Sequence, residues 1–169
     1  REDRTPTVDT WFLFTIAEEV GLGASSVLLP DVAAMVTVDN GTTAPGQNSS
    51  EFGVTIAMAD QTGPFDWHLS RKLVQLARTY DIKHQKDVFR YYRSDSASAL
   101  EAGADIRTAL VTFGIDASHG YERIHESALE DLSRLLIAYA ESDVEISRDA
   151  KSLSGAKGFT HQPVGDEVD

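Results

Sequence analysis

Residues 11–23 read WFLFTIAEEVGLG: an apolar run, then Glu18 and Glu19, then a glycine turn. The run, residues 11–17, is rich in aromatic and β-branched types, which is typical of a strand buried on both faces. Two adjacent carboxylates beside the end of such a strand are costly unless their charge is neutralised, and a divalent cation neutralises it well. The other open interpretation is a solvated loop pair, or a pair that caps the following helix.

Outward from this stretch, segments with strand patterns alternate with segments of helical periodicity. The expected strands are residues 11–17, 33–38, 54–59, 83–92 and 106–113. The expected helices are residues 24–29, 66–80, 95–101 and 127–140, with Ser94 as the N-cap of the third. This order predicts a layered α/β fold with a mostly parallel sheet. We expect residues 1–148 to form one domain and residues 149–169, which lack periodicity, to form a loose tail.

Composition narrows the classes of partner and ligand. The 169 residues carry a net charge of −12, which argues against nucleic acid or an anionic membrane as the partner. No apolar run approaches the roughly 18 residues that span a bilayer, so we expect no membrane partner and a cytoplasmic location. The chain has no cysteine, so a metal here must be held by His, Asp and Glu.

Four segments resemble the catalytic motifs of the M42 family of metallo-aminopeptidases. Residues 15–24 resemble the family's strand with a double glutamate, and residues 30–39 resemble its second ligand strand. Residues 93–97 resemble its Gly-Thr-Asp-Ala segment, and residues 121–127 resemble its terminal histidine motif. Each is weak alone, but together they come in family order at plausible spacing. The resemblance implies a three-layer α/β/α fold with a mostly parallel mixed sheet. It also implies that this chain is the C-terminal part of a zinc-peptidase-like catalytic domain.

The resemblance assigns a role to each matching residue. Glu18 resembles the general base that takes a proton from the attacking water. Glu19 resembles a ligand of one metal ion, together with His125, and Asp39 resembles a ligand of a second ion. Zinc is the expected metal, with cobalt or manganese as alternatives. Two cations about 3.5–4 Å apart suit amide hydrolysis, and a carboxylate that is not a ligand must then move the proton.

The chain also departs from the family pattern. The terminal motif reads SHGYERIH over residues 118–125, so His119 competes with His125 as the histidine ligand. Asp95 is either a second capping residue or a residue that supports a ligand or faces the substrate. The upstream histidine and the bridging aspartate of the family have no counterpart here. We therefore expect the chain alone to have little or no peptidase activity.

Three functions stay open from the sequence. The first is metal-dependent hydrolysis of an N-terminal peptide bond by a homo-oligomeric aminopeptidase acting on a peptide or small amide. The second is a deacylase or carboxypeptidase acting on a modified dipeptide. The third is a non-catalytic binding or assembly domain. Residues 38–48 and 59–64 resemble an M42-like hydrolase subgroup associated with clusters for the osmoprotectant N-acetylglutaminylglutamine amide.

Overall fold

Two strands in which most residues are buried form the centre of the sheet: β2 (Val54–Asp60) and β5 (Arg107–Asp116). In this computed structural model, which describes residues 5–144, they pair antiparallel between β1 (Ala34–Thr42) and β3 (Gly63–Pro64), in the order β1-β5-β2-β3. β4 (His84–Val88) pairs with β2, and β6 (Arg123–Ile124) pairs with β5. The two longest pairings, β1 with β5 and β2 with β4, are parallel.

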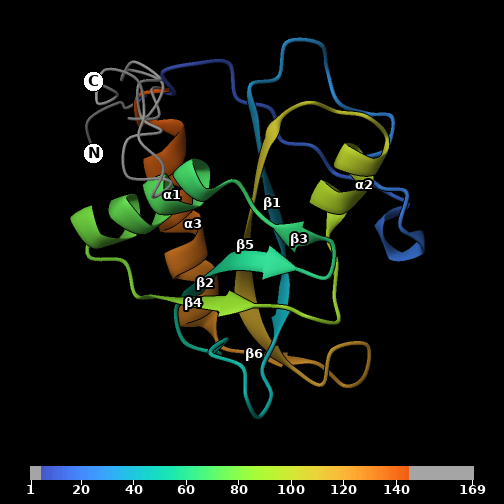
Figure 1. The fold of residues 1–169 in the computed structure, drawn as a ribbon. Helices are drawn as coiled ribbons and strands as arrows, with labels where there is room; N and C mark the ends of the chain where they lie inside the picture. The colour runs from blue at the N-terminus through green and yellow to red at the C-terminus, as the bar shows by residue number, and fades with distance from the viewer. Residues whose placement is uncertain (1–4, 145–169) are drawn as a thin grey trace, which may run out of the picture.

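Helices cover both faces of this sheet (Figure 1). On one face lie α1 (Trp67–Thr79) and α3 (Glu126–Ala140), which pack against β2, β5 and each other. On the other face the short helix α2 (Asp95–Glu101) packs against β1 and β5. The three-layer α/β/α arrangement with a mixed sheet, expected from the sequence, is confirmed.

Alternation along the strands divides the buried residues between two cores. Val54, Ile56 and Val111 face α1 and α3, where Leu73 and Leu135 pack against them. The opposite face carries a smaller core, formed by Ala57, Phe65, Phe89 and Leu110. Because that core is small, the α2 face leaves room for a cavity beside it.

Several predicted boundaries shift. β1 and β5 run four and three residues past their predicted ends, and β4 ends four residues before its own. Ser94 holds the N-cap position of α2 but makes no capping hydrogen bond with its side chain. No helix of the described residues is long and apolar enough to cross a membrane. The predicted tail, residues 149–169, lies outside the described residues, as does the predicted boundary at residue 148.

The predicted strand at residues 11–17 is wrong, and so is the predicted helix at residues 24–29. Residues 11–15 are unpaired coil, and a short 3₁₀ helix, η1 (Glu18–Val20), follows them. The apolar pattern indicates burial, but a strand also needs an edge to pair with and a surface to bury against. Neither is supplied to this segment by residues 5–144 of the chain.

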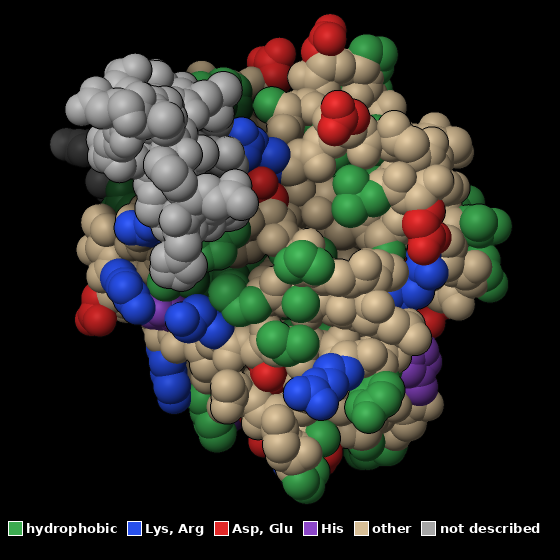
Figure 2. All heavy atoms as spheres, in the orientation of Figure 1, with side chains coloured by type: hydrophobic (Ala, Val, Ile, Leu, Met, Phe, Trp, Pro, Cys, Tyr) green, Lys and Arg blue, Asp and Glu red, His purple; other side chains and the backbone are tan. Residues whose placement is uncertain are grey.

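The N-terminal segment consequently presents large apolar side chains to solvent. Trp11, Phe12 and Phe14 are 70%, 78% and 88% exposed. Figure 2 shows hydrophobic side chains at the right-hand margin of the molecule, where Figure 1 draws part of this segment in blue. Exposed apolar patches beyond a few hundred Å² are interaction surfaces.

We expect the 169-residue chain to self-associate through this segment, despite its charge of −12. Light scattering over a concentration series should give an apparent mass that rises with concentration. The double variant Trp11→Ser, Phe14→Ser should reduce that rise, whereas Tyr121→Ser, an exposed aromatic on another segment, should not. A wild-type chain that stays strictly monomeric over the series would contradict this prediction.

Candidate functional site

A cavity of about 300 Å³ lies on the α2 face of the sheet. It is bordered by η1, the later part of β1, the segment after β4 and the loop before β6. Its lining consists of Glu18, Glu19, Gly21, Asp39, Asn40, Thr42, Asp60, Phe89, Tyr91, Tyr92, Arg93, Leu110, Ser118 and His119. Four of these residues are acidic and two are basic or imidazole, so the cavity carries an excess of negative charge.

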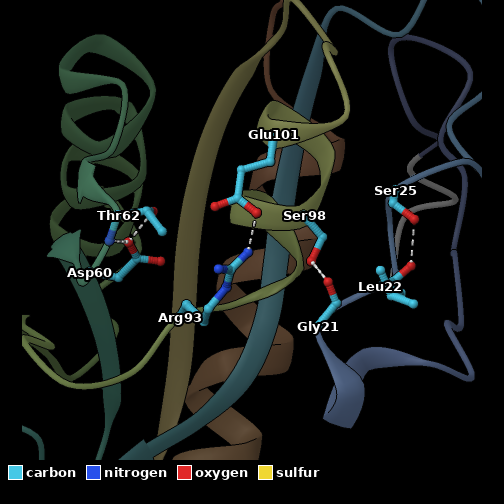
Figure 3. Close-up of polar contacts among 8 residues, drawn as sticks. All are labelled: Gly21, Leu22, Ser25, Asp60, Thr62, Arg93, Ser98 and Glu101. Atoms are coloured by element: carbon cyan, nitrogen blue, oxygen red, sulfur yellow. Dashed lines mark hydrogen bonds and ion pairs between the residues drawn. The ribbon is translucent and has the colours of Figure 1, made fainter.

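Glu18 and Glu19 reach the cavity from η1, which replaces the predicted strand end. Gly21 ends this turn with φ +73°, and its N–H donates to the Glu18 carbonyl at 2.7 Å. Ser98 on α2 donates from Oγ to the Gly21 carbonyl at 2.9 Å, as Figure 3 shows. The turn is therefore fixed to α2, although the Glu19 side chain is exposed and Glu18 is only partly buried.

Asp39 enters the cavity from inside β1, three residues before the strand ends. Its Oδ1 accepts a hydrogen bond from the Asn40 backbone N–H at 2.7 Å. Nearby, the hydroxyls of Thr37 and Ser96 lie 2.6 Å apart and join β1 to α2. The sheet thus holds Asp39 more rigidly than η1 holds the two glutamates.

His119 comes from the loop before β6, where it has a positive φ of 63°. Its Nδ1 lies 3.9 Å from Oε2 of Glu19. The His119 backbone N–H donates to Oε1 of Glu122 at 2.9 Å, which closes the loop on itself. This left-handed turn, rather than a strand or helix, brings the imidazole to the carboxylates.

Asp95 contacts the segment that carries Glu18 and Glu19. It is 7% exposed, and its Oδ2 accepts a hydrogen bond from Thr15 Oγ1 at 2.6 Å. A Cβ added at Gly23 would lie 2.0 Å from Asp95 Oδ1, so the glycine turn needs Gly23 to pass this carboxylate. Asp95 therefore contacts the chain on both sides of the double glutamate and does not line the cavity itself.

The carboxylates disfavour one another's charge. Burial, followed by the nearby charges of Asp39, Asp95 and Glu19, raises the pKa of Glu18 above its ordinary value. Burial also raises the pKa of Asp39, with smaller contributions from Asp95 and Glu19, while its bond from Asn40 works in the opposite direction. The charge of His119 opposes both shifts but does not cancel them, so both pKa values stay raised. A bound cation would remove this penalty.

His125 lies elsewhere in the fold. It is the N-cap of α3, where its Nδ1 accepts a hydrogen bond from the Ser127 backbone N–H at 3.2 Å. Its ring packs against Phe52 with the centroids 4.7 Å apart. It does not border the cavity. Of the two candidate histidines, His119 is the one that the structure brings to Glu19.

The donor set fits divalent metal ions in chemistry but is incomplete in number. Carboxylate and imidazole suit zinc and similar ions. Burial and neighbouring acids raise the pKa of Glu18 and of Asp39, so a bound cation would favour their charged forms. Among residues 5–144, however, no group of three or more His, Cys, Asp and Glu side chains is close enough to hold a metal ion. A complete site needs donors in addition to those described.

The far end of the cavity, where Asp60 lies, was not expected from the sequence; Tyr91, Tyr92 and Arg93 line the cavity as well. In the sequence, Asp60 directly follows the predicted strand at residues 54–59, just as Asp39 directly follows the predicted strand at residues 33–38. That position was the available signal. The segment at residues 89–92 was assigned to a strand, which concealed its contribution to a cavity wall.

The sequence matches the M42 glutamyl aminopeptidase family over residues 1–135. The chain belongs to this family. It is 38% identical over 141 residues to YhfE, a proposed aminopeptidase of Bacillus subtilis (strain 168), covering 83% of this chain and 41% of YhfE.

Solved structures agree with the M42 assignment. The TET1 peptidase of Pyrococcus horikoshii, which can assemble into a tetrahedron or a large octahedral shell, matches with a TM-score of 0.65 and 25% identity over 75% of this chain and 39% of its own. The aminopeptidase APDkam598 of the archaeon Desulfurococcus kamchatkensis has the same coverage, with a TM-score of 0.66 and 21% identity, and supports the fold alone. The chain spans about two fifths of the length of these relatives.

Proposed function

We propose that this chain forms the C-terminal part of the catalytic domain of a two-metal aminopeptidase, the parent enzyme, which hydrolyses the N-terminal bond of a peptide or small amide. The observation that carries the proposal is the gathering of Glu18, Glu19, Asp39 and His119 around one cavity in an M42 family member. Family membership alone would not select these residues, and the cavity alone would not select the reaction.

In this proposal Glu19 and His119 hold one metal ion and Asp39 helps to hold the other. When bound, two divalent ions supply charge that polarises the scissile carbonyl. Zinc is the proposed metal, with cobalt and manganese as alternatives. The remaining donors come from parts of the parent enzyme outside residues 5–144.

Glu18 is left to act as the general base. It borders the cavity beside the ligand candidates, and its raised pKa brings its basicity closer to that needed for proton transfer near neutral pH. In this role it takes a proton from the attacking water and returns it to the leaving amine. Asp95, Thr15 and Gly23 keep the double glutamate turned towards the cavity.

Assembly into a closed homo-oligomer is part of the proposal, because the TET1 peptidase forms closed shells. In such an oligomer, contacts between subunits would bury the exposed apolar side chains of the N-terminal segment.

The activity test compares substrates that differ at the amino end. The parent enzyme, with metal supplied, should cleave aminoacyl anilides that have a free amine, and a chelator should abolish the cleavage. An N-acetylated dipeptide amide, which suits a deacylase and the osmoprotectant-associated subgroup, should be cleaved much more slowly. Faster turnover of the acetylated compound would replace the aminopeptidase proposal with the deacylase alternative.

The two histidines give a separate prediction about metal. His119→Ala in the parent enzyme should lower the metal content measured after dialysis by elemental analysis. His125→Ala should leave that content unchanged and reduce the free energy of unfolding by about 1 kcal/mol, because it removes an N-cap. Metal loss in the His125 variant, with full metal in the His119 variant, would reverse the assignment.

A non-catalytic binding or assembly domain is the second candidate. The absence of a group of three metal-binding side chains among residues 5–144 favours it for this chain taken alone. The purified 169-residue chain should accordingly show little or no hydrolysis of aminoacyl anilides even with added zinc, cobalt or manganese.

A further inference from the structure

The far end of the cavity contains a buried carboxylate with an unused oxygen. Asp60, the last residue of β2, is 6% exposed and lines the cavity. Its Oδ1 accepts hydrogen bonds from the backbone N–H and the hydroxyl of Thr62, at 2.8 and 2.5 Å. Its Oδ2 has no hydrogen-bond partner. A buried carboxylate oxygen without a donor is costly, so this atom marks where a donor from outside belongs.

Aromatic and apolar side chains line the cavity together with Asp60. Phe89, Tyr91, Tyr92 and Leu110 line the same cavity. Two backbone hydrogen bonds hold their segment beside Asp60: Phe89 N–H donates to the Ala59 carbonyl at 3.0 Å, and Gln61 N–H donates to the Tyr92 carbonyl at 2.9 Å. Aromatic rings around a carboxylate suit a cationic group with an aliphatic stem.

The nearest cation in the cavity is already engaged. The Arg93 guanidinium donates to Glu101 Oε2 at 2.6 Å, and this bond, the Glu101 charge and, to a smaller extent, the Asp60 charge raise the Arg93 pKa. Figure 3 shows Arg93 directed towards Glu101 while the Asp60 carboxylate is bonded to Thr62. Within the described part of the chain, Asp60 forms no ion pair within 4 Å, and Arg93 acts on it only at longer range, so Oδ2 is left for a donor from a ligand.

Strand register sets the distance between the two ends of the cavity. Asp39 pairs with Thr112, and Leu110 pairs with Ala57, three residues before Asp60. Asp60 is five residues beyond the level of Asp39, but a β-bulge between Ala57 and Ala59 takes up one of them. The displacement along the strands is therefore about four steps, or about 13 Å at about 3.3 Å per residue. One amino-acid residue does not span this distance. A peptide whose N-terminal residue occupies the Glu18–Glu19 end would reach Asp60 with a later residue.

We infer that Asp60, with the aromatic rings beside it, forms a subsite for a lysine or arginine side chain located beyond the N-terminal residue of a peptide substrate. This inference rests on the proposed aminopeptidase function. The substrate cation donates to Oδ2 of Asp60 while its aliphatic stem lies against the rings. Arg93 stays with Glu101 and leaves the subsite free.

The test uses tetrapeptides of alanine with lysine or norleucine placed at each position in turn, since norleucine has the lysine stem without the charge. Hydrolysis by the metal-loaded parent enzyme gives kcat/KM, and calorimetric titration into the chelated enzyme gives binding without cleavage. Lysine should be preferred about tenfold or more at one position after the first, as expected for a hydrogen bond to a charged group. Asp60→Asn should remove the preference in both measurements.

Asp87→Asn is the matched control, because Asp87 is also a buried aspartate but lies outside the cavity with both oxygens bonded, to Ser49, Gln47 and Val88. This variant should keep the lysine preference whatever its stability. The subsite would be overturned if wild type and Asp60→Asn had the same lysine preference. It would also be overturned if wild type had no lysine preference at any position, a comparison that does not need Asp60→Asn to fold. Binding that depends on Asp60 without hydrolysis of any peptide would instead reject the aminopeptidase proposal and keep the subsite.

Discussion

Replacing Glu18 by glutamine in the parent enzyme should lower kcat by at least about a hundredfold and leave the bound metal unchanged. Glutamine keeps the shape of the side chain but cannot accept the proton, and positioned general bases contribute about 10²–10⁴-fold to rate. Steady-state kinetics on an aminoacyl anilide, together with elemental analysis of the dialysed protein, measure both quantities. KM should change little, because the substitution removes a proton acceptor rather than a binding contact.

Glu19→Gln is the matched control, since it makes the same chemical change at the adjacent residue. The Glu19 carboxylate lies 3.9 Å from His119 Nδ1, and we propose it as a ligand. This variant should lose metal, and excess metal in the assay should partly restore its activity. Equal metal loss in the two variants would show that the roles are divided wrongly between the glutamates.

Gly114→Ala should be the most destabilising single methyl addition in the described part of the chain. An added Cβ would lie 1.9 Å from the Ser50 carbonyl oxygen and 2.6 Å from the Glu51 nitrogen, both backbone atoms that cannot rotate away. Either β5 or the connection between β1 and β2 must shift. Overpacking of this kind costs about 1–3 kcal/mol or more, and we expect a loss of at least about 3 kcal/mol from the free energy of unfolding.

Denaturant unfolding of the purified chain measures this loss, and Gly46→Ala separates its causes. Gly46 has a positive φ of 88° but no atom within 4 Å of an added Cβ. Its substitution should therefore cost only backbone strain, about 1–2 kcal/mol. A Gly114→Ala protein no less stable than Gly46→Ala would mean that the connection does not pack on β5 as described.

Local pattern was sufficient for elements whose stability comes from one amphipathic face. The periodicity of Leu69, Leu73 and Ala77 predicted α1 within one residue at each end. That of Leu129, Leu132, Leu136 and Tyr139 predicted α3 equally well. The buried runs of β1, β2 and β5 were predicted in the same way. These elements bury their apolar residues within the described chain, so the pattern and the packing agree.

The same reasoning failed for residues 11–17, because apolar composition does not provide a partner strand. The sequence also did not decide which of two histidines is the candidate metal ligand. His119 and His125 lie in one short motif, and either imidazole is chemically suitable. Only the left-handed turn at His119 and the capping position of His125 distinguish them. Backbone geometry of this kind depends on how β6 and α3 pack after the loop.

The sequence by itself determined the α/β class, the family and the acidic residues Glu18, Glu19 and Asp39 as site candidates. This was possible because residue types and their spacing along the chain are local properties. The tertiary structure decided that His119 reaches Glu19, that Asp95 supports the double glutamate and that Asp60 lines the other end of the cavity with one buried, unpaired oxygen. Each of these depends on distances between residues far apart in the chain, and those distances are fixed only when the strands adopt their register and α2 packs across them.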